Sequence, residues 1–146
     1  MRLTKLQQEQ VLLQVAAHKH KTYHTDIQLT DVVFLRHFSV FSNVLRPEVM
    51  SALQLAQWLY FNNGLYLGKK VMDMGSGSGI QGVVAGLYGA STVVFSDIAP
   101  DAELNAKENI KQYHLESKSR VVRGNLFESI SEKADIIIFN HPFFSD

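Results

Sequence analysis

The sequence predicts an α/β fold: a doubly wound, mainly parallel sheet with helices on both faces. Three observations predict it. The chain has 146 residues, which is the size of a single domain. Its second half alternates short apolar runs with segments of helix length, as βαβ units do. These apolar runs end in glycine or polar residues, at the edge where such sheets bind ligands.

The first part of the chain carries a different pattern. Thr4 and the spaced leucines and alanines that follow predict a helix over residues 4–20. The β-rich segment 27–41 predicts one or two strands, and Pro47 opens a second helix. We therefore expect an N-terminal helix and β-rich extension over residues 1–40. A ligand-binding domain over residues 41–146 follows it.

The elements of the second part follow from hydrophobic runs and turn residues. Strands are predicted at residues 70–72, 92–96, 119–123 and 134–139, with helices over 80–88 and from Pro100 onward. Strand 134–139 is almost continuously apolar, which is typical of a parallel strand covered on both faces.

Each predicted strand end carries residues suited to binding. In order they are Asp73-Met74-Gly75-Ser76-Gly77-Ser78-Gly79, Asp97, Gly124-Asn125-Leu126-Phe127 and Asn140-His141-Pro142-Phe143. The glycines let the backbone turn closely beneath a ligand and leave amide groups free at a helix start. Asp97 stands 18 residues after Gly79, where a carboxylate can accept hydrogen bonds from ribose hydroxyls. The pattern indicates a cofactor that contains a nucleoside.

Two cofactor classes compete for the glycine-rich segment. Residues 77–82 match the G-x-G-x-x-G fingerprint of dinucleotide binding, which favours a nicotinamide or flavin cofactor. Asp73 and Gly75 come before that fingerprint, however, and a carboxylate there would repel a pyrophosphate. It would instead suit a cofactor with a cationic amino group and no phosphate, such as S-adenosylmethionine.

The segments DMGSGSG, Asp97, GNLF and NHPF resemble the successive motifs of class I (Rossmann-like) S-adenosylmethionine-dependent methyltransferases. More narrowly, they resemble the methyltransferase small domain group, which carries an Asn-Pro-Pro-Tyr/Phe motif. That group includes release-factor glutamine methyltransferases and rRNA, tRNA and DNA base N-methyltransferases. The resemblance covers about residues 40–146.

The resemblance implies a role for each matching residue. The cofactor-binding set is Asp73, Met74, Gly75, Ser76, Gly77, Gly79, Asp97, Ile98, Asn125, Leu126 and Asn140, and the catalytic set is Asn140, His141, Pro142 and Phe143. Asp73 and the nearby glycines would face the methionine part of the cofactor, and Asp97 would hold the ribose. Ile98 would pack on the adenine, whose edge Asn125 and the Leu126 backbone would read.

The same resemblance implies how a methyl group is transferred. The Asn140 side-chain oxygen and the carbonyl of residue 141 would accept the N–H protons of a planar acceptor, on which Phe143 would stack. Two residues depart from the family pattern. Asn125 stands where the family has Asp, which implies weaker cofactor binding, and His141 replaces a proline that would lock the backbone.

The expected function is therefore an S-adenosylmethionine-dependent N-methyltransferase acting on a planar amide or exocyclic amine. The acceptor would be an RNA or DNA base or a protein glutamine. Two alternatives remain: an NAD(P)-dependent oxidoreductase and a non-catalytic Rossmann-like binding module.

Composition limits the other classes. The chain has no cysteine, which excludes thiolate metal sites, and its formal net charge of zero argues against a strongly basic nucleic-acid surface. No apolar run approaches the roughly 20 residues of a membrane helix, so we expect a cytoplasmic protein without membrane contact. His18, His20 and His24 are interpreted as a solvated helix end and not as a metal site.

The family sheet has seven strands, whereas this chain stops after the fourth predicted strand. We expect either a piece of a longer protein or an edge strand that pairs with another chain.

Overall fold

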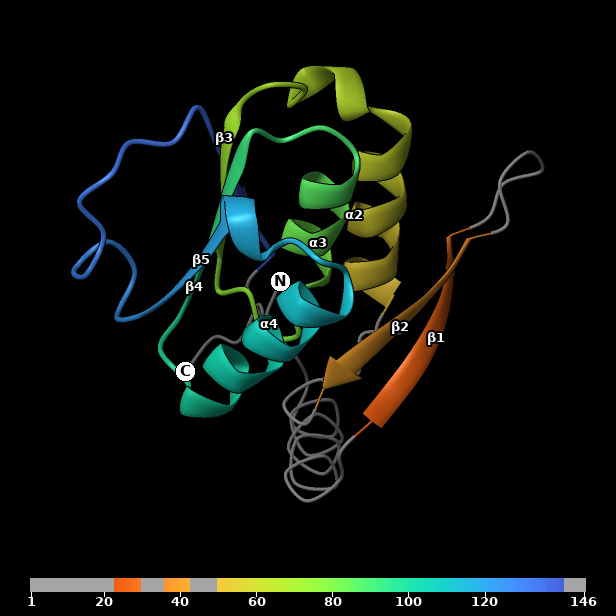
Figure 1. The fold of residues 1–146 in the computed structure, drawn as a ribbon, viewed down its shortest axis with the longest axis horizontal. Coiled ribbons are helices and arrows are strands. Elements are labelled where there is room, and N and C mark those ends of the chain that lie inside the picture. The colour runs from red at the N-terminus through yellow and green to blue at the C-terminus, as the bar shows by residue number, and fades with distance from the viewer. Residues whose placement is uncertain (1–22, 30–35, 43–49, 141–146) are drawn as a thin grey trace, which may run out of the picture.

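The computed structural model describes residues 23–29, 36–42 and 50–140 (Figure 1). The helix expected over residues 4–20, the helix start at Pro47 and the segment His141–Phe143 lie outside these residues.

The β-rich segment forms two strands, as its pattern allowed. β1 (Tyr23–Leu29) pairs antiparallel with β2 (Arg36–Ser42), and together they make a sheet of their own. β2 runs two residues past position 40, so the expected domain boundary falls inside a strand.

The second half folds into the predicted parallel sheet. Its strands are β3 (Lys70–Met74), β4 (Thr92–Asp97), β5 (Ser119–Arg123) and β6 (Ile136–Phe139), in the order β5-β4-β3-β6. Every pairing is parallel. The chain moves outward from β3 to β5 and then returns to place β6 on the other side of β3. The carboxyl ends of β3 and β6 therefore flank the point where strand order reverses, the usual ligand site of such sheets.

The helices α2 (Met50–Phe61), α3 (Ile80–Leu87) and α4 (Pro100–Gln112) pack on one face of this sheet (Figure 1). Two short 3-10 helices, η1 (Asn63–Leu65) and η2 (Glu116–Lys118), follow α2 and α4. The main core lies between sheet and helices and is built from side chains of every layer: Ala56, Leu59, Val71, Val83, Val84, Val93, Phe95, Ala106, Ile110 and Ile138.

We expected helices on the opposite face of the sheet as well, but the described residues that cover it form no helix. Met72, Met74 and Val94 pack there against the segment 124–135, which joins β5 to β6 without forming a helix. This segment is short and mostly polar, so it lacks the apolar stripe that would seat a helix on the sheet. Within the described residues, helices cover one face only.

None of the helices in residues 50–140 combines the length and hydrophobicity that a membrane span requires.

Candidate functional site

The chain leaves β3 through a glycine turn, defined here as residues 75–79. Gly75, Gly77 and Gly79 adopt φ values of +64°, +52° and +79°, a region in which the backbone of other residues is strained. The turn is pinned to the neighbouring strand because the Ser76 amide donates to the carbonyl oxygen of Ser96, 3.0 Å away. The predicted glycine-rich loop is therefore a fixed turn at the end of β3.

Gly82 has a packing reason of its own. A Cβ at this position would lie 2.3 Å from Cε1 of Phe95, a fully buried ring on β4. Helix α3 therefore rests directly on the sheet. This third glycine of the dinucleotide-like fingerprint is explained by helix–sheet packing, whichever cofactor binds.

Asp73 is buried beneath the turn, with 2% of its surface exposed. Its Oδ2 accepts a hydrogen bond from the Gly82 amide at 2.8 Å. Helix α3 needs this acceptor because its N-cap residue, Gly79, has no side chain to cap the first turn. Burial raises the Asp73 pKa to about 8; the Gly82 hydrogen bond opposes the shift, and the charge of Asp97 adds to it.

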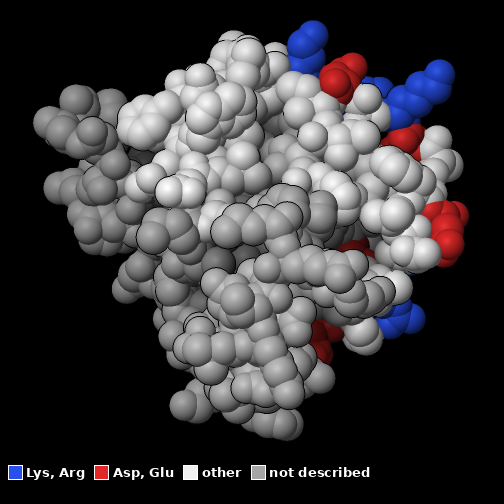
Figure 2. Space-filling model, turned by 180° about the vertical axis from the view of Figure 1, so that it is seen from behind, with Lys and Arg blue, Asp and Glu red and all other residues white. Residues whose placement is uncertain are grey.

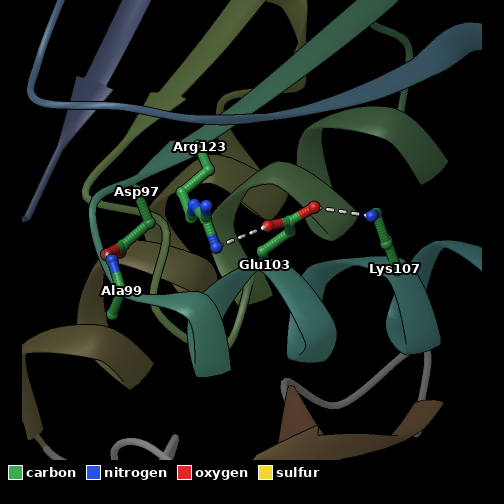
Figure 3. Close-up of polar contacts among 5 residues, drawn as sticks. All are labelled: Asp97, Ala99, Glu103, Lys107 and Arg123. Atoms are coloured by element: carbon green, nitrogen blue, oxygen red, sulfur yellow. Dashed lines mark hydrogen bonds and ion pairs between the residues drawn. The ribbon is translucent and has the colours of Figure 1, made fainter.

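Asp97 ends β4 and is only partly buried. Its Oδ2 accepts from the Gly77 amide and its Oδ1 from the Ala99 amide, both at 2.9 Å. Figure 3 shows it beside Arg123 at the end of β5. Asp97 and Asp73, from two neighbouring strands, thus bind backbone amides of the glycine turn and of the first turn of α3, contacts that the sequence did not predict.

An ion-pair group borders Asp97 on its outer side (Figure 3). Glu103 on α4 accepts a hydrogen bond from Lys107 at 2.6 Å and lies 3.9 Å from the Arg123 guanidinium. These cations lower the pKa of Glu103, chiefly through the Lys107 hydrogen bond. The group is largely exposed to solvent, so it contributes little to holding the site together.

Two exposed apolar side chains follow the ends of β4 and β5. Ile98 is 66% exposed and Leu126 is 49% exposed, and Leu126 has an unusual φ of +50°. Beside Leu126, the Asn125 amide nitrogen donates to Glu128 at 3.2 Å, which leaves the Asn125 oxygen as an acceptor. Both strand ends therefore present the residue types expected for an adenine.

Asn140 directly follows β6, whose last residue, Phe139, pairs with Met74. The Phe139 ring lies 3.4 Å from the position that a Cβ of Gly75 would occupy. Asn140 is therefore next to the glycine turn, across the point where strand order reverses. The structure places Asp73, the glycine turn, Asp97 and Asn140 at the carboxyl edge of the sheet, whereas the predicted cofactor residue Met74 is buried in the core of the opposite face. His141, Pro142 and Phe143 lie outside its description.

One contact to the turn was missed by the sequence analysis. Asn109, in the last turn of α4, is fully buried, and its Nδ2 donates to the Ser78 carbonyl at 2.6 Å. The available signal was a polar residue on the apolar face of this helix, one turn after Ala106.

Among the described residues, no group of three or more His, Asp or Glu side chains is arranged to hold a metal ion.

The model of the ribosomal protein L11 methyltransferase (PrmA) family matches residues 56–141, which include the glycine turn, both aspartates and Asn140. The chain belongs to this family. The resemblance to class I S-adenosylmethionine-dependent methyltransferases is thereby confirmed, and the cofactor of the family is S-adenosylmethionine.

Individual relatives agree with the family match. The ribosomal protein L11 methyltransferase of Carboxydothermus hydrogenoformans is 40% identical over 73 residues, which are 50% of this chain and 24% of the relative. The chain thus spans about a quarter of the length of the curated relatives that it matches.

Solved structures share the fold. The ribosomal protein L11 methylase of Lactobacillus delbrueckii has a TM-score of 0.51 at 29% identity, covering 60% of this chain and 45% of its own. The PRMT1 enzyme–prozyme complex of Trypanosoma brucei, solved with AdoHcy, has a TM-score of 0.55 at 30% identity, covering 59% and 27%.

The residues of the site fit this cofactor. Asp73 is buried beneath the glycine turn, where a bound ammonium or sulfonium group would favour its ionised form and a pyrophosphate would oppose it.

Proposed function

We propose that this protein transfers a methyl group from S-adenosylmethionine to a nitrogen atom of a protein acceptor. The observation that carries the proposal is the pair of aspartates at the ends of β3 and β4, both bonded to the backbone around the glycine turn. Relatives in the family are named for ribosomal protein L11, so L11 is the first acceptor to test.

In this proposal the two aspartates divide the cofactor between them. Asp97 accepts hydrogen bonds from the ribose hydroxyls, because its partly exposed oxygens have lone pairs beyond those used by Gly77 and Ala99. The backbone of the glycine turn lies along the methionine part. Asp73 is nearly inaccessible to direct contact, and with a pKa of about 8 it is mostly protonated at neutral pH, so it becomes negatively charged only when a cationic group binds nearby.

The adenine is assigned to the ends of β4 and β5. Ile98 and Leu126 offer exposed apolar surface to its faces, and the Asn125 oxygen accepts from its amino group. An uncharged amide gives a weaker hydrogen bond than the carboxylate usual in the resembling group, so we expect modest cofactor affinity.

The acceptor is assigned to the end of β6. The side-chain oxygen of Asn140 and the carbonyl of His141 would accept its N–H protons and stabilise positive charge as it develops on nitrogen, and Phe143 would stack on a flat acceptor. The bound cofactor supplies a methyl group already activated by its positive sulfur. The acceptor nitrogen would form the new N–C bond with its lone pair, the electrons of the broken S–C bond would stay on the cofactor sulfur, and the methylated nitrogen would then release a proton.

The charged surface agrees with a protein acceptor. On the face shown in Figure 2, lysines and arginines of the described residues are interspersed with acidic residues along one margin and form no basic patch. Strong binding to a phosphate backbone needs an excess of cations.

The test combines calorimetry with methyl transfer. We expect the 146-residue chain to bind S-adenosylmethionine more tightly than NAD, and tritiated methyl groups to appear in L11. The variant Asn140→Ala should bind the cofactor normally and lose transfer. Tighter NAD binding would favour the oxidoreductase, label confined to RNA would favour a base acceptor, and cofactor binding without any transfer would favour a binding module.

A further inference from the structure

The side chain of Asn109 joins α4 to the glycine turn. It lies at 0% exposure in α4 and donates from Nδ2 to the carbonyl oxygen of Ser78, 31 positions earlier in the chain, at 2.6 Å. Burying an amide without partners is costly, so a short bond to a distant loop indicates a required contact.

The Ser78 carbonyl lies within the glycine turn, in a residue that is 6% exposed. The neighbouring carbonyls have backbone partners: Ser76 accepts from the Gly79 amide at 2.7 Å and Gly79 accepts from the Val83 amide at 2.9 Å. Ser78 instead receives its hydrogen bond from the Asn109 side chain. Asn109, which lies outside the glycine turn, therefore supplies the hydrogen-bond donor for this carbonyl oxygen.

Helix α4 approaches the turn closely enough for this contact because its facing residues are small. Ala102 and Ala106 are fully buried, and the Ala106 Cα lies 3.5 Å from the position of a Cβ at Gly79. Asn109 is three residues beyond Ala106 and lies on the same face.

The same helix is also tied to the ribose-binding end of the site. α4 begins at Pro100, and Asp97 accepts from the Ala99 amide immediately before it. One rigid helix is thus attached to Asp97 near its first turn and to the glycine turn through Asn109. α4 is therefore a second connection between these two parts of the site, in addition to the direct hydrogen bond from the Gly77 amide to Asp97.

We propose that Asn109 is a positioning residue for the cofactor: it holds Ser78, and through it the Gly77 amide, at the spacing from Asp97 that the nucleoside requires. Asn109 itself does not touch the cofactor. The identity of that ligand rests on the proposed function, whereas the effect on the turn does not.

The experiment compares Asn109→Leu, Asn109→Ala and Ile110→Ala with the wild-type chain. Asn109→Leu keeps nearly the same volume without a donor, and Asn109→Ala serves if leucine cannot be accommodated. Ile110→Ala is the matched control, because Ile110 is a buried residue of the same helix that belongs to the main core. Hydrogen exchange of the ligand-free chains and calorimetry with S-adenosylmethionine are the two readouts.

We expect exchange of the Gly77 and Gly79 amides to accelerate about tenfold in the Asn109 variants, the factor that corresponds to about 1.4 kcal/mol. Cofactor affinity should fall by a similar factor. Ile110→Ala should lower the melting temperature without a selective effect on those two amides.

Wild-type exchange at Gly77 and Gly79 in both Asn109 variants would overturn the inference. So would acceleration spread evenly over the chain, as a purely structural residue would produce. If the wild-type chain binds no S-adenosylmethionine, the proposed function fails, and the exchange comparison still decides whether Asn109 holds the turn.

Discussion

The ends of β3 and β4 carry the same residue type in contrasting surroundings. Asp73 accepts a hydrogen bond from the Gly82 amide in the first turn of α3, and Asp97 accepts one from the Gly77 amide in the glycine turn. Asp73 is 2% exposed and caps a helix, whereas Asp97 is partly exposed and borders open surface. Burial therefore separates a carboxylate that builds the site from one that can meet a ligand.

The largest effect on cofactor binding should come from the accessible carboxylate. Asp97→Ala removes the ribose acceptor and leaves the Gly77 and Ala99 amides without their partner. We expect S-adenosylmethionine affinity to fall about 100-fold, or about 2.7 kcal/mol, by calorimetry. Unchanged affinity would mean that Asp97 is not the ribose acceptor. The proposed difference in role between Asp73 and Asp97 would then be wrong.

A smaller effect, on the stability of the fold, is expected near the buried Asp73, at Gly82. In Gly82→Ala the new methyl group would overlap the Phe95 ring, and α3 would have to move away from the sheet. Chemical denaturation should show a loss of about 2 kcal/mol in the free energy of unfolding.

Gly64→Ala is the control for this variant. No atom lies within 4 Å of the position of a Cβ at Gly64, so this substitution creates no overlap. Equal stability losses in the two variants would show that contact with Phe95 is not the cause.

The buried Asp73 should also make the stability of the fold depend on pH. The pKa of Asp73 is raised from 3.8 to about 8, so between these values the folded protein holds a proton that the unfolded chain has released. The contribution of Asp73 to the free energy of unfolding is therefore fully present below about pH 4 and is lost as the pH rises toward 8.

The variant Asp73→Asn tests this dependence because it keeps an oxygen acceptor for the Gly82 amide and cannot ionise. The free energy of unfolding of the wild type, minus that of the variant, should fall by up to about 1.4 kcal/mol per pH unit across this window. Denaturation series at several pH values measure it, and a difference independent of pH would contradict the buried-acid assignment.

The smallest effect on stability and cofactor affinity is expected at Glu103, which lies near Asp97 but outside the glycine turn. Glu103→Gln removes the charge that faces Lys107 and Arg123, in a group largely open to solvent. Melting temperature and cofactor affinity should stay within error of the wild type. A clear loss of affinity would mean that these charges act on the ligand together with Asp97.

The strands were predictable because each is a short apolar run between turn residues. β5 was placed at its observed bounds, and β3 runs two residues further than predicted, through Asp73 and Met74. The sequence could not separate strand from turn there, because that depends on pairing with β4 and β6.

The site was predictable as a set of strand ends but not in its internal contacts. The order of the motifs along the chain placed Asp73, Asp97 and Asn140 at one edge of the sheet. The capping bond from Asp73 to Gly82 and the contact from Asn109 to Ser78 depend on how α3 and α4 are seated, which periodicity does not encode.

The acid buried beneath the glycine turn has a thermodynamic consequence. With a pKa of about 8, Asp73 carries a proton in most molecules at neutral pH. A cation that settles nearby stabilises the ionised form, so its arrival expels hydrogen ions into the medium. The measured heat of association will then include the ionisation enthalpy of whichever buffer takes them up.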